Sequence, residues 1–240
     1  MSLNRSSLLL LVAVSLPLTP VIASAQSTDR SKLVNQIEEL RNQIKQKEGQ
    51  LLAVSDQDKA AYSEFLSQPD TGICRLMPRE DFDGKLLVRG GGAYYSFTKK
   101  SSSYDSYPQI GLERNEFLTS FAGADYGYIT DLGDVPIEAL TAEYPAVRDL
   151  AAFTTPNAEP DARIEQRKSG QGLSVGNHVY KRGAGAAVGH SYVLRSVIYD
   201  NSDTLVAVRV VKQDDDGSLI LLWRILNRFP SPQLLRGDTR

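Results

Sequence analysis

Apolar residues step by four and three positions between residues 33 and 54, which is the spacing of a helix with one apolar face. They fit a heptad repeat with isoleucine at two a positions and leucine at d, a combination that favours parallel two-stranded coiled coils. Lys47 interrupts the d series, and Val54 is its last member. The apolar stripe consists of Leu33, Ile37, Leu40, Ile44 and Leu51.

We expect the stripe to lie on a helical arm over residues 29–67. Residues 55–58, Ser-Asp-Gln-Asp, have the spacing of a capping box, so the helix should break near Ser55 and restart. Pro69 ends the arm because proline removes a backbone donor and clashes with a continuing turn. The pattern does not show what covers the stripe: the arm either forms a homodimer or packs on its own domain.

The character of the sequence changes after residue 72, where short β-branched and aromatic runs alternate with Gly, Asp, Asn and Pro. This pattern predicts an α+β fold, with an antiparallel β-rich domain over residues 72–230 and a flexible tail over 231–240. Helices are expected at 135–153, where Pro145 should kink or divide the helix, and at 158–168. The expected strands are 85–89, 93–99, 116–121, 127–131, 172–175, 178–181, 192–199, 204–211 and 219–226.

The dipeptide Asp-Gly at 216–217 predicts a two-residue hairpin turn, because both residues tolerate positive φ. A turn centred there pairs Val210 with Trp223 and Arg209 with Arg224. One face of the ribbon is then wholly apolar and should lie in the core, and the other face carries arginines.

An odd-length loop should precede this ribbon, since a two-residue turn would push Arg195 into the apolar face, where an unpaired charge is costly. Arg195 then aligns with Arg209, and a row of arginines, Arg195, Arg209 and Arg224, crosses neighbouring strands. The row either binds a carboxylate or phosphate ligand or is paired internally, for example with Asp200 or Asp203.

The first 25 residues read as a signal peptide. Arg5 precedes an apolar run over residues 8–18, and Ala-Ser-Ala at 23–25 is a small-x-small cleavage pattern before Gln26. An uncleaved anchor is the alternative, but the run is shorter than the roughly 20 residues that span a bilayer. We therefore expect export to the periplasm or the extracellular space, with no transmembrane segment in the mature chain.

Composition and net charge limit the classes of partner that the chain is expected to bind. The chain of 240 residues is 41% apolar and 23% charged, which is ordinary for a globular protein. Cleavage would remove one charged residue, Arg5, and leave 26 basic and 29 acidic residues, a net charge of −3. Such a charge argues against a nucleic-acid partner. Cys74 is the single cysteine, so an internal disulfide is excluded and stability must come from packing.

Three glycine-rich segments resemble functional loops only in part. The glycines at 90–92 precede Tyr94 and Tyr95 instead of a helix, so they predict a turn or bulge and not a phosphate cradle. Gly-Leu-Ser-Val-Gly at 172–176 has the spacing of a nucleophile elbow, but no acid and then histidine follow Ser174 in that order. The run 183–189 lacks the dinucleotide fingerprint and is expected to be a loop.

Few other residues are candidates for catalysis or for metal binding. Asp70-Thr71-Gly72 matches the catalytic triplet of aspartic proteases, which need two such aspartates, so a dimer would have to supply the second. Neither His178 nor His190 has a partner at metal-ligand spacing, and we expect no metal or cofactor.

The tyrosines Tyr94 and Tyr95 either stack on sugars or peptides or pack in the core. The sequence as a whole predicts an exported cell-envelope interaction or scaffolding protein with an envelope polymer or protein as partner. The alternatives are a binding module for an anionic or glycan ligand, using the arginines or the tyrosines, and a hydrolase using Asp70 or Ser174.

Overall fold

The computed structural model describes residues 22–235, with side chains from residue 29 onward. The chain divides into two compact units, one ending at Gln43 and the other beginning at Ile44. Most of the expected signal peptide, residues 1–21, lies outside the described residues, whereas residues 22–25 already belong to helix α1 (Ile22–Leu52).

The long N-terminal helix is present, and it breaks where the capping box predicts. Helix α2 (Asp56–Ala61) is capped by the Ser55 side chain, which accepts the backbone N–H of Asp58 at 3.0 Å. Helix α3 (Ser63–Leu66) follows and ends before Pro69. Val54 lies beyond the end of α1 and is buried, so its expected place in the heptad series is wrong.

The remaining chain is mainly antiparallel β structure, as predicted. One sheet has five strands in the order β1-β11-β10-β9-β5, a second has four in the order β2-β3-β4-β8, and β6 and β7 form a separate hairpin. The strands are β1 (Thr71–Leu76), β2 (Tyr94–Tyr95), β3 (Ile110–Glu113), β4 (Glu116–Leu118), β5 (Tyr126–Asp131), β6 (Leu173–Val175), β7 (His178–Tyr180), β8 (Gly183–Gly185), β9 (Ser191–Ile198), β10 (Ser202–Gln213) and β11 (Leu219–Phe229).

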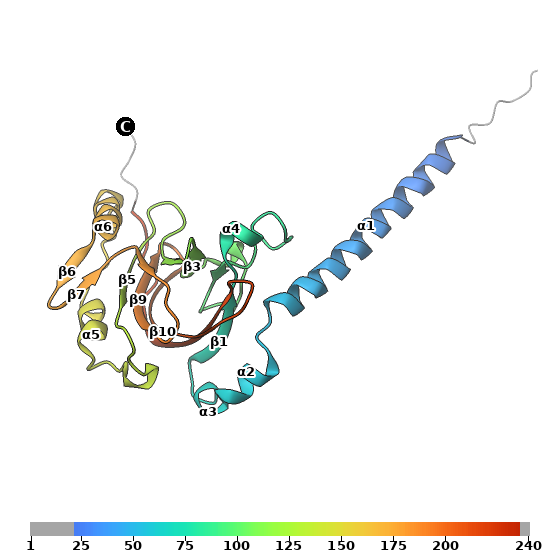
Figure 1. The fold of residues 1–240 in the computed structure, drawn as a ribbon. Coiled ribbons are helices and arrows are strands. Elements are labelled where there is room, and N and C mark those ends of the chain that lie inside the picture. Colours follow the sequence, from blue (N-terminus) through green and yellow to red (C-terminus); the bar gives the residue numbers. More distant parts are fainter. Residues whose placement is uncertain (1–21, 236–240) are drawn as a thin grey trace, which may run out of the picture. The chain divides into compact units, whose positions relative to one another are not determined.

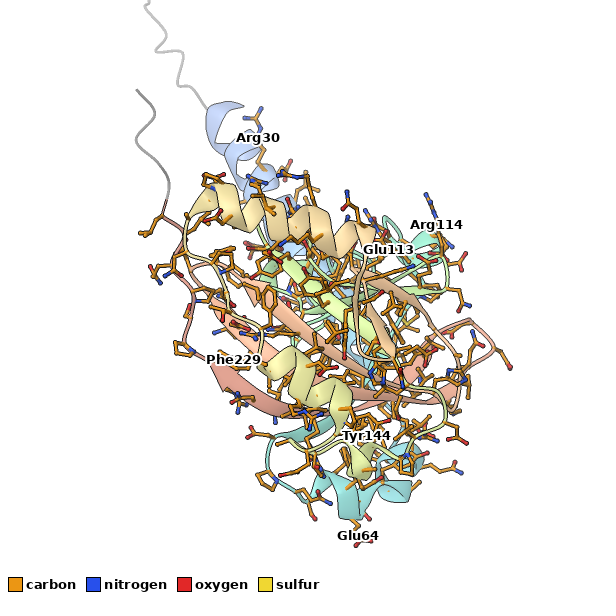
Figure 2. The ribbon with its side chains drawn as sticks, turned by 90° about the vertical axis from the view of Figure 1, so that its left-hand side faces the viewer. Arg30, Glu64, Glu113, Arg114, Tyr144 and Phe229 are labelled. Carbon is orange, nitrogen blue, oxygen red and sulfur yellow. The ribbon has the colours of Figure 1, made fainter. Side chains whose placement is uncertain are left out.

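Helices cover one face of the five-stranded sheet. Helices α5 (Pro145–Ala151) and α6 (Glu159–Gln171) lie on the same side of β5 and β9 (Figure 1). Tyr144 and Phe229, labelled in Figure 2, pack against the core on this face. The short helical segments are α4 (Arg79–Phe82), η1 (Tyr104–Ser106) and η2 (Ile137–Ala139).

A second core lies between the two sheets. Alternate residues of β10 and β11 point into it, and Trp223 is only 1% exposed. This arrangement confirms which face of the ribbon is apolar. Gly72 of β1 lies opposite Trp223, and a Cβ atom on Gly72 would come within 2.2 Å of the indole ring. The inward residues of the ribbon are Val206, Val208, Val210, Leu221, Trp223 and Ile225.

The pairing of β10 with β11 differs from the expected register by two residues. Leu219 pairs with Gln213 around the acidic turn, and a register shift between Val210 and Lys212 then sets Val208 opposite Trp223. The pairing at the turn and the register shift after Val210 each displace the two strands by one residue relative to the expected register. Two such displacements restore the original alternation, so the faces are as predicted although the partners are not.

The odd loop before β10 is confirmed, but the register is again different. Ser202 pairs with Ile198 across three residues, which include Asp200 at φ 60°. Leu194 therefore lies on the apolar face, and Arg195 is kept out of it, as the odd loop predicts. Arg195 lies opposite Leu205 and not opposite Arg209, so the expected row of adjacent arginines is wrong.

Several other expected elements are wrong. Residues 85–89 form a loop because the carboxylate of Glu48 accepts the backbone N–H groups of Leu87 and Val88. The strand expected at 93–99 is reduced to β2, and the three preceding glycines have positive φ, as a turn requires. The helix expected at 135–153 is reduced to η2 and α5.

Three strands were not predicted. β1 and β3 contain few β-branched residues, and β8 is part of the glycine-rich run that was expected to be a loop. Residues 231–235 are attached to the domain instead of forming a free tail. The backbone of Leu235 exchanges hydrogen bonds with Asn157 and Glu159, and residues 236–240 lie outside the described residues.

Candidate functional site

The apolar stripe of α1 is exposed. Its five side chains keep between 39% and 57% of their accessible surface, the least being Leu51 and the most Leu33 and Leu40. Glu48, which lies between Ile44 and Leu51 along the helix, is buried instead and binds the 85–89 loop through its carboxylate. The last two turns of α1, which belong to the second unit, are thus bound to this loop, whereas Ile44 and Leu51 on the same turns are exposed.

Arg195 lies inside the protein. Its guanidinium is 3% exposed and forms a salt bridge with Asp203 at 2.7 Å. It also donates to the carbonyl oxygens of Leu150 and Phe153 at the end of α5, and it lies 3.7 Å from the centre of the Phe229 ring. Internal pairing with Asp203, one of the two expected alternatives, is therefore what the structure shows for this residue.

The other two arginines of the expected row are held separately. Arg209 forms a salt bridge with Asp134 at 2.7 Å and donates to the carbonyl oxygen of Val135 at 2.8 Å. Arg224 donates to the side-chain oxygen of Gln68 and lies over the Phe65 ring. The three guanidiniums do not come together on one surface.

Tyr94 and Tyr95 are buried, because both pack on other rings. Tyr94 makes edge-on contacts with Tyr104 and Phe121, and its hydroxyl donates to Glu113, labelled in Figure 2, at 2.7 Å. Burial, followed by the Glu113 hydrogen bond, raises the pKa of Tyr94 far above its usual value. Neither ring face is open for stacking on a ligand, so that expected use is wrong.

The two residues considered for hydrolysis both lie at the surface. Ser174 is exposed in β6, two residues before the two-residue turn that joins β6 to β7. Asp70 has φ 57° and pairs with Arg228 at 2.6 Å, and this hydrogen bond lowers the pKa of its carboxyl. Among the described residues, neither histidine is hydrogen-bonded to Ser174: His190 binds Asp131, with its Nδ1 at 3.0 Å from both carboxylate oxygens.

A polar cleft of about 810 Å³ lies where the edges of the two sheets meet. We call it the β8 cleft. It is lined by residues 129–131 of β5, 177–179 of the β6–β7 hairpin, 181–185 around β8, Gly170 of α6, and Glu116 and Leu118 of β4. A single bridge between Ile129 and Lys181 joins the two sheets at this edge.

Arg182 lines this cleft together with Lys181 and the carboxylates of Glu116 and Asp131. Its guanidinium donates to two successive carbonyl oxygens, those of Thr119 and Ser120, each at 3.2 Å. No carboxylate in the described part of the chain forms an ion pair with it. The side chain is exposed, so its charge is held in position by neutral acceptors and stays available to an anion.

A smaller pocket of about 330 Å³ adjoins the β8 cleft through Arg182. Its other two arginines are compensated: Arg79 pairs with Glu113 at 2.7 Å, and Arg89 pairs with Asp105 at 2.9 Å. Arg182, which lines both hollows, is therefore the one arginine of this pocket without a carboxylate partner among the described residues.

The described residues contain no group of three or more histidine, cysteine or acidic side chains that could hold a metal ion. In the same part of the chain, no helix combines the length and the apolar character needed to cross a membrane. Cys74 is buried in β1, and burial raises the pKa of its thiol far above the usual value.

Comparison with known proteins finds no relative of this chain. No family model matches the chain, and neither a curated protein nor a solved structure is detectably similar to it.

Proposed function

We propose that this chain is an exported interaction or scaffolding protein of the cell envelope, and that it forms a parallel homodimer through α1. The observation that carries the proposal is the exposed apolar stripe on that helix. Export rests on the signal-peptide pattern of residues 1–25.

The stripe supports pairing with a second copy on energetic grounds. Fully burying a leucine or isoleucine side chain is worth about 1.5–3 kcal/mol, and these side chains keep roughly half of their surface exposed. Five such residues from each helix would thus supply on the order of 10 kcal/mol toward the cost of association. Isoleucine at a with leucine at d favours two parallel strands. Lys47 within the seam and a length of about three heptads limit the affinity, so dimers should form at micromolar concentration.

The dimer is tested with a triple substitution in the seam: Ile37→Asn, Leu40→Asn and Ile44→Asn. We expect sedimentation equilibrium to give a dimer for the unchanged chain and a monomer for the variant, because asparagine removes the apolar surface that drives pairing. The matched control is Glu38→Asn with Lys45→Asn on the outer face of the same helix, which should remain dimeric. A monomer for the unchanged chain at all micromolar concentrations would contradict the proposal.

Orientation is tested in the same experiment with one added thiol. Leu40→Cys places two cysteines opposite each other in a parallel pair, so mild oxidation should give a covalent dimer. Lys45→Cys on the outer face should not. Cys74 does not interfere because it is buried.

A further inference from the structure

We propose that a pocket at the end of β9 binds an alkylammonium ion, whose charge is held by the Asp125 carboxylate and the Tyr107 ring. We call this hollow of about 270 Å³ the Asp125 pocket. It is formed by η1 and the turn after it, by the loop that leads into β5, and by Ile198 at the end of β9. None of the described residues that line it belongs to the apolar stripe of α1, so the site is separate from the proposed dimer seam.

The lining of the Asp125 pocket suits a positively charged ligand. Its two charged side chains, Asp105 and Asp125, are both acidic, and no lysine, arginine or histidine is among the described residues that line it. The other lining side chains are aromatic or apolar: Tyr104, Tyr107, Pro108, Phe121, Ala122 and Ile198. Because ring faces and carboxylate oxygens both carry negative potential, this combination attracts a cation that also has apolar groups.

Asp125 is the carboxylate of this lining that has no partner of opposite charge. Its Oδ1 accepts the backbone N–H of Tyr199 at 3.0 Å, whereas no described residue donates a hydrogen bond to its Oδ2 or forms an ion pair with it. The side chain is partly buried, and a partly desolvated carboxylate without a cation costs stability. A costly charge in a pocket is typical of a binding site, where the ligand supplies the missing partner.

The charged groups around Asp125 do not supply that partner. Burial is the main cause that raises the pKa of its carboxyl, Asp200 raises this pKa further, and Arg163 lowers it. Arg163 is engaged elsewhere, because it pairs with Glu159 at 3.1 Å and donates to the carbonyl oxygen of Gly123 at 2.6 Å. It therefore acts on Asp125 only as a charge at a distance, and a bound cation can approach the carboxylate directly.

The protein already holds one of its own cations with the same two kinds of group. Arg89 pairs with Asp105 at 2.9 Å, and its guanidinium carbon lies 4.5 Å from the centre of the Tyr104 ring. Tyr107 is half exposed, and its side chain makes no ring contact or hydrogen bond with any described residue. Tyr107 and Asp125 thus offer a second ring and a second carboxylate, which no cation of the described chain occupies.

The polar groups of the pocket fit an ammonium ion better than a sugar. A sugar ring needs several hydrogen-bonding partners as well as a stacking surface. The Tyr104 hydroxyl already donates to the carbonyl oxygen of Phe121 at 2.9 Å, and Asp105 is held by Arg89. An alkylammonium ion needs only one carboxylate, ring faces and apolar walls. The same chemistry is found in a free amine and in the lysine side chain of a protein partner.

The test is a titration of the full-length protein followed by NMR, with n-butylammonium as the probe. We expect binding at millimolar concentration, and binding of 1-butanol at least about tenfold more weakly, because the alcohol has the same carbon chain without the charge. A second arm uses lysine blocked at its backbone amine and carboxyl groups. Equal affinity for blocked lysine assigns the cation to a protein partner, and binding of n-butylammonium alone assigns it to a free amine.

Substitutions place the probe in this pocket. Asp125→Asn should weaken n-butylammonium binding at least about tenfold, since it removes the charge and keeps an acceptor for the Tyr199 N–H. Tyr107→Ala should weaken it about threefold, because an exposed cation–π contact is of that size. Two controls should bind normally: Tyr107→Phe, which keeps the ring, and Asp215→Asn, which removes an exposed carboxylate outside the pocket.

The proposal is overturned if 1-butanol binds as tightly as n-butylammonium, or if Asp125→Asn binds the probe as well as the unchanged chain. A parallel glycan array tests the other ligand class: glycan binding that is lost in the Asp125 and Tyr107 variants would assign the pocket to a sugar. If Asp125→Asn fails to fold, judged by its melting temperature, Tyr107→Ala and the comparison with 1-butanol decide. The variant with three seam substitutions should keep full affinity for n-butylammonium, so failure of the dimer and failure of this site are distinguishable.

Discussion

Asp125 has an unusual environment for a carboxylate. It is partly buried, and one of its oxygens accepts the backbone N–H of Tyr199 at 3.0 Å. Burial raises the pKa of Asp125 to about 6, with a further increase from Asp200, while the Tyr199 hydrogen bond acts in the opposite direction. The folded protein therefore holds this proton more tightly than the unfolded chain does, and stability falls as the pH rises from about 4 through about 6.

Asp125→Asn should abolish the loss of stability that the unchanged chain shows as the pH rises. The amide oxygen can still accept the Tyr199 N–H, but it carries no charge to desolvate. At pH 8 we expect the variant to be more stable than the unchanged chain by about 1–2 kcal/mol, which is the pKa shift converted to free energy and reduced for partial exposure. At pH 4 the two should be equal. Urea unfolding at both pH values measures this, with exposed Asp215→Asn as the control. The same difference in unfolding free energy at pH 4 and at pH 8 would show that the charge of Asp125 is not the cause.

At the scale of elements, a buried ion pair ties helix α5 to the five-stranded sheet. Arg195 of β9 binds Asp203 of β10 and, through two further N–H groups, the carbonyl oxygens at the end of α5. Thr155, after the helix, also donates to Asp203 at 2.7 Å. The pair thus fixes the helical layer as well as two strands.

Asp203→Ala should be strongly destabilising, because it leaves the Arg195 charge buried without its partner. We expect a loss of about 3–5 kcal/mol in the free energy of urea unfolding. Arg195→Met combined with Asp203→Leu should recover much of it, since no unpaired charge then remains. The control is Asp134→Ala, which removes the partner of Arg209; Asp134 is 80% exposed, so its loss should cost less than about 1 kcal/mol. Equal effects of Asp203→Ala and Asp134→Ala would contradict the role of burial.

The faces of the sheet were predictable from the sequence, and the partners were not. Alternation of apolar and polar residues decides which side chains of β10 and β11 point inward, and it does so whether the pairing is displaced by none or by two residues. The same alternation predicts that the loop after Ile198 is odd in length, but neither its exact length nor the bulge near Val211 leaves a comparable signature. For that reason Arg195 was expected next to Arg209 but lies opposite Leu205.

The candidate site was less predictable than the fold. The β8 cleft combines three parts of the chain that are far apart in sequence, 116–118, 129–131 and 170–185, and only the three-dimensional pairing of β4 with β8 brings Arg182 beside the first of them. The Gly-Ala-Gly strand has no β-branched residue, so its composition indicates a loop.

At the scale of the whole molecule, the start of α1 and the expected cleavage site overlap. The helix begins at Ile22, four residues before Gln26, so removal of residues 1–25 would shorten it without touching the apolar stripe. The proposed mature chain therefore keeps its proposed dimer seam.

Export is tested by the mass of the mature protein. The chain is expressed with its first 25 residues in a bacterium that has a periplasm. We expect it in the periplasmic fraction, with the mass of a chain whose first residue is Gln26. Ala23→Leu with Ala25→Leu should block cleavage, because the peptidase requires small residues there, and should leave an uncleaved product. A full-length chain in the cytoplasm would contradict the proposal.

Glu48 has a consequence for how the end of α1 is held. Its carboxylate accepts two successive backbone amides of the 85–89 loop, and Leu52 packs over Gly92 a few residues further on. Replacing Glu48 by alanine would remove both hydrogen bonds and leave Leu52 as the remaining anchor of these turns, without altering a residue of the apolar stripe.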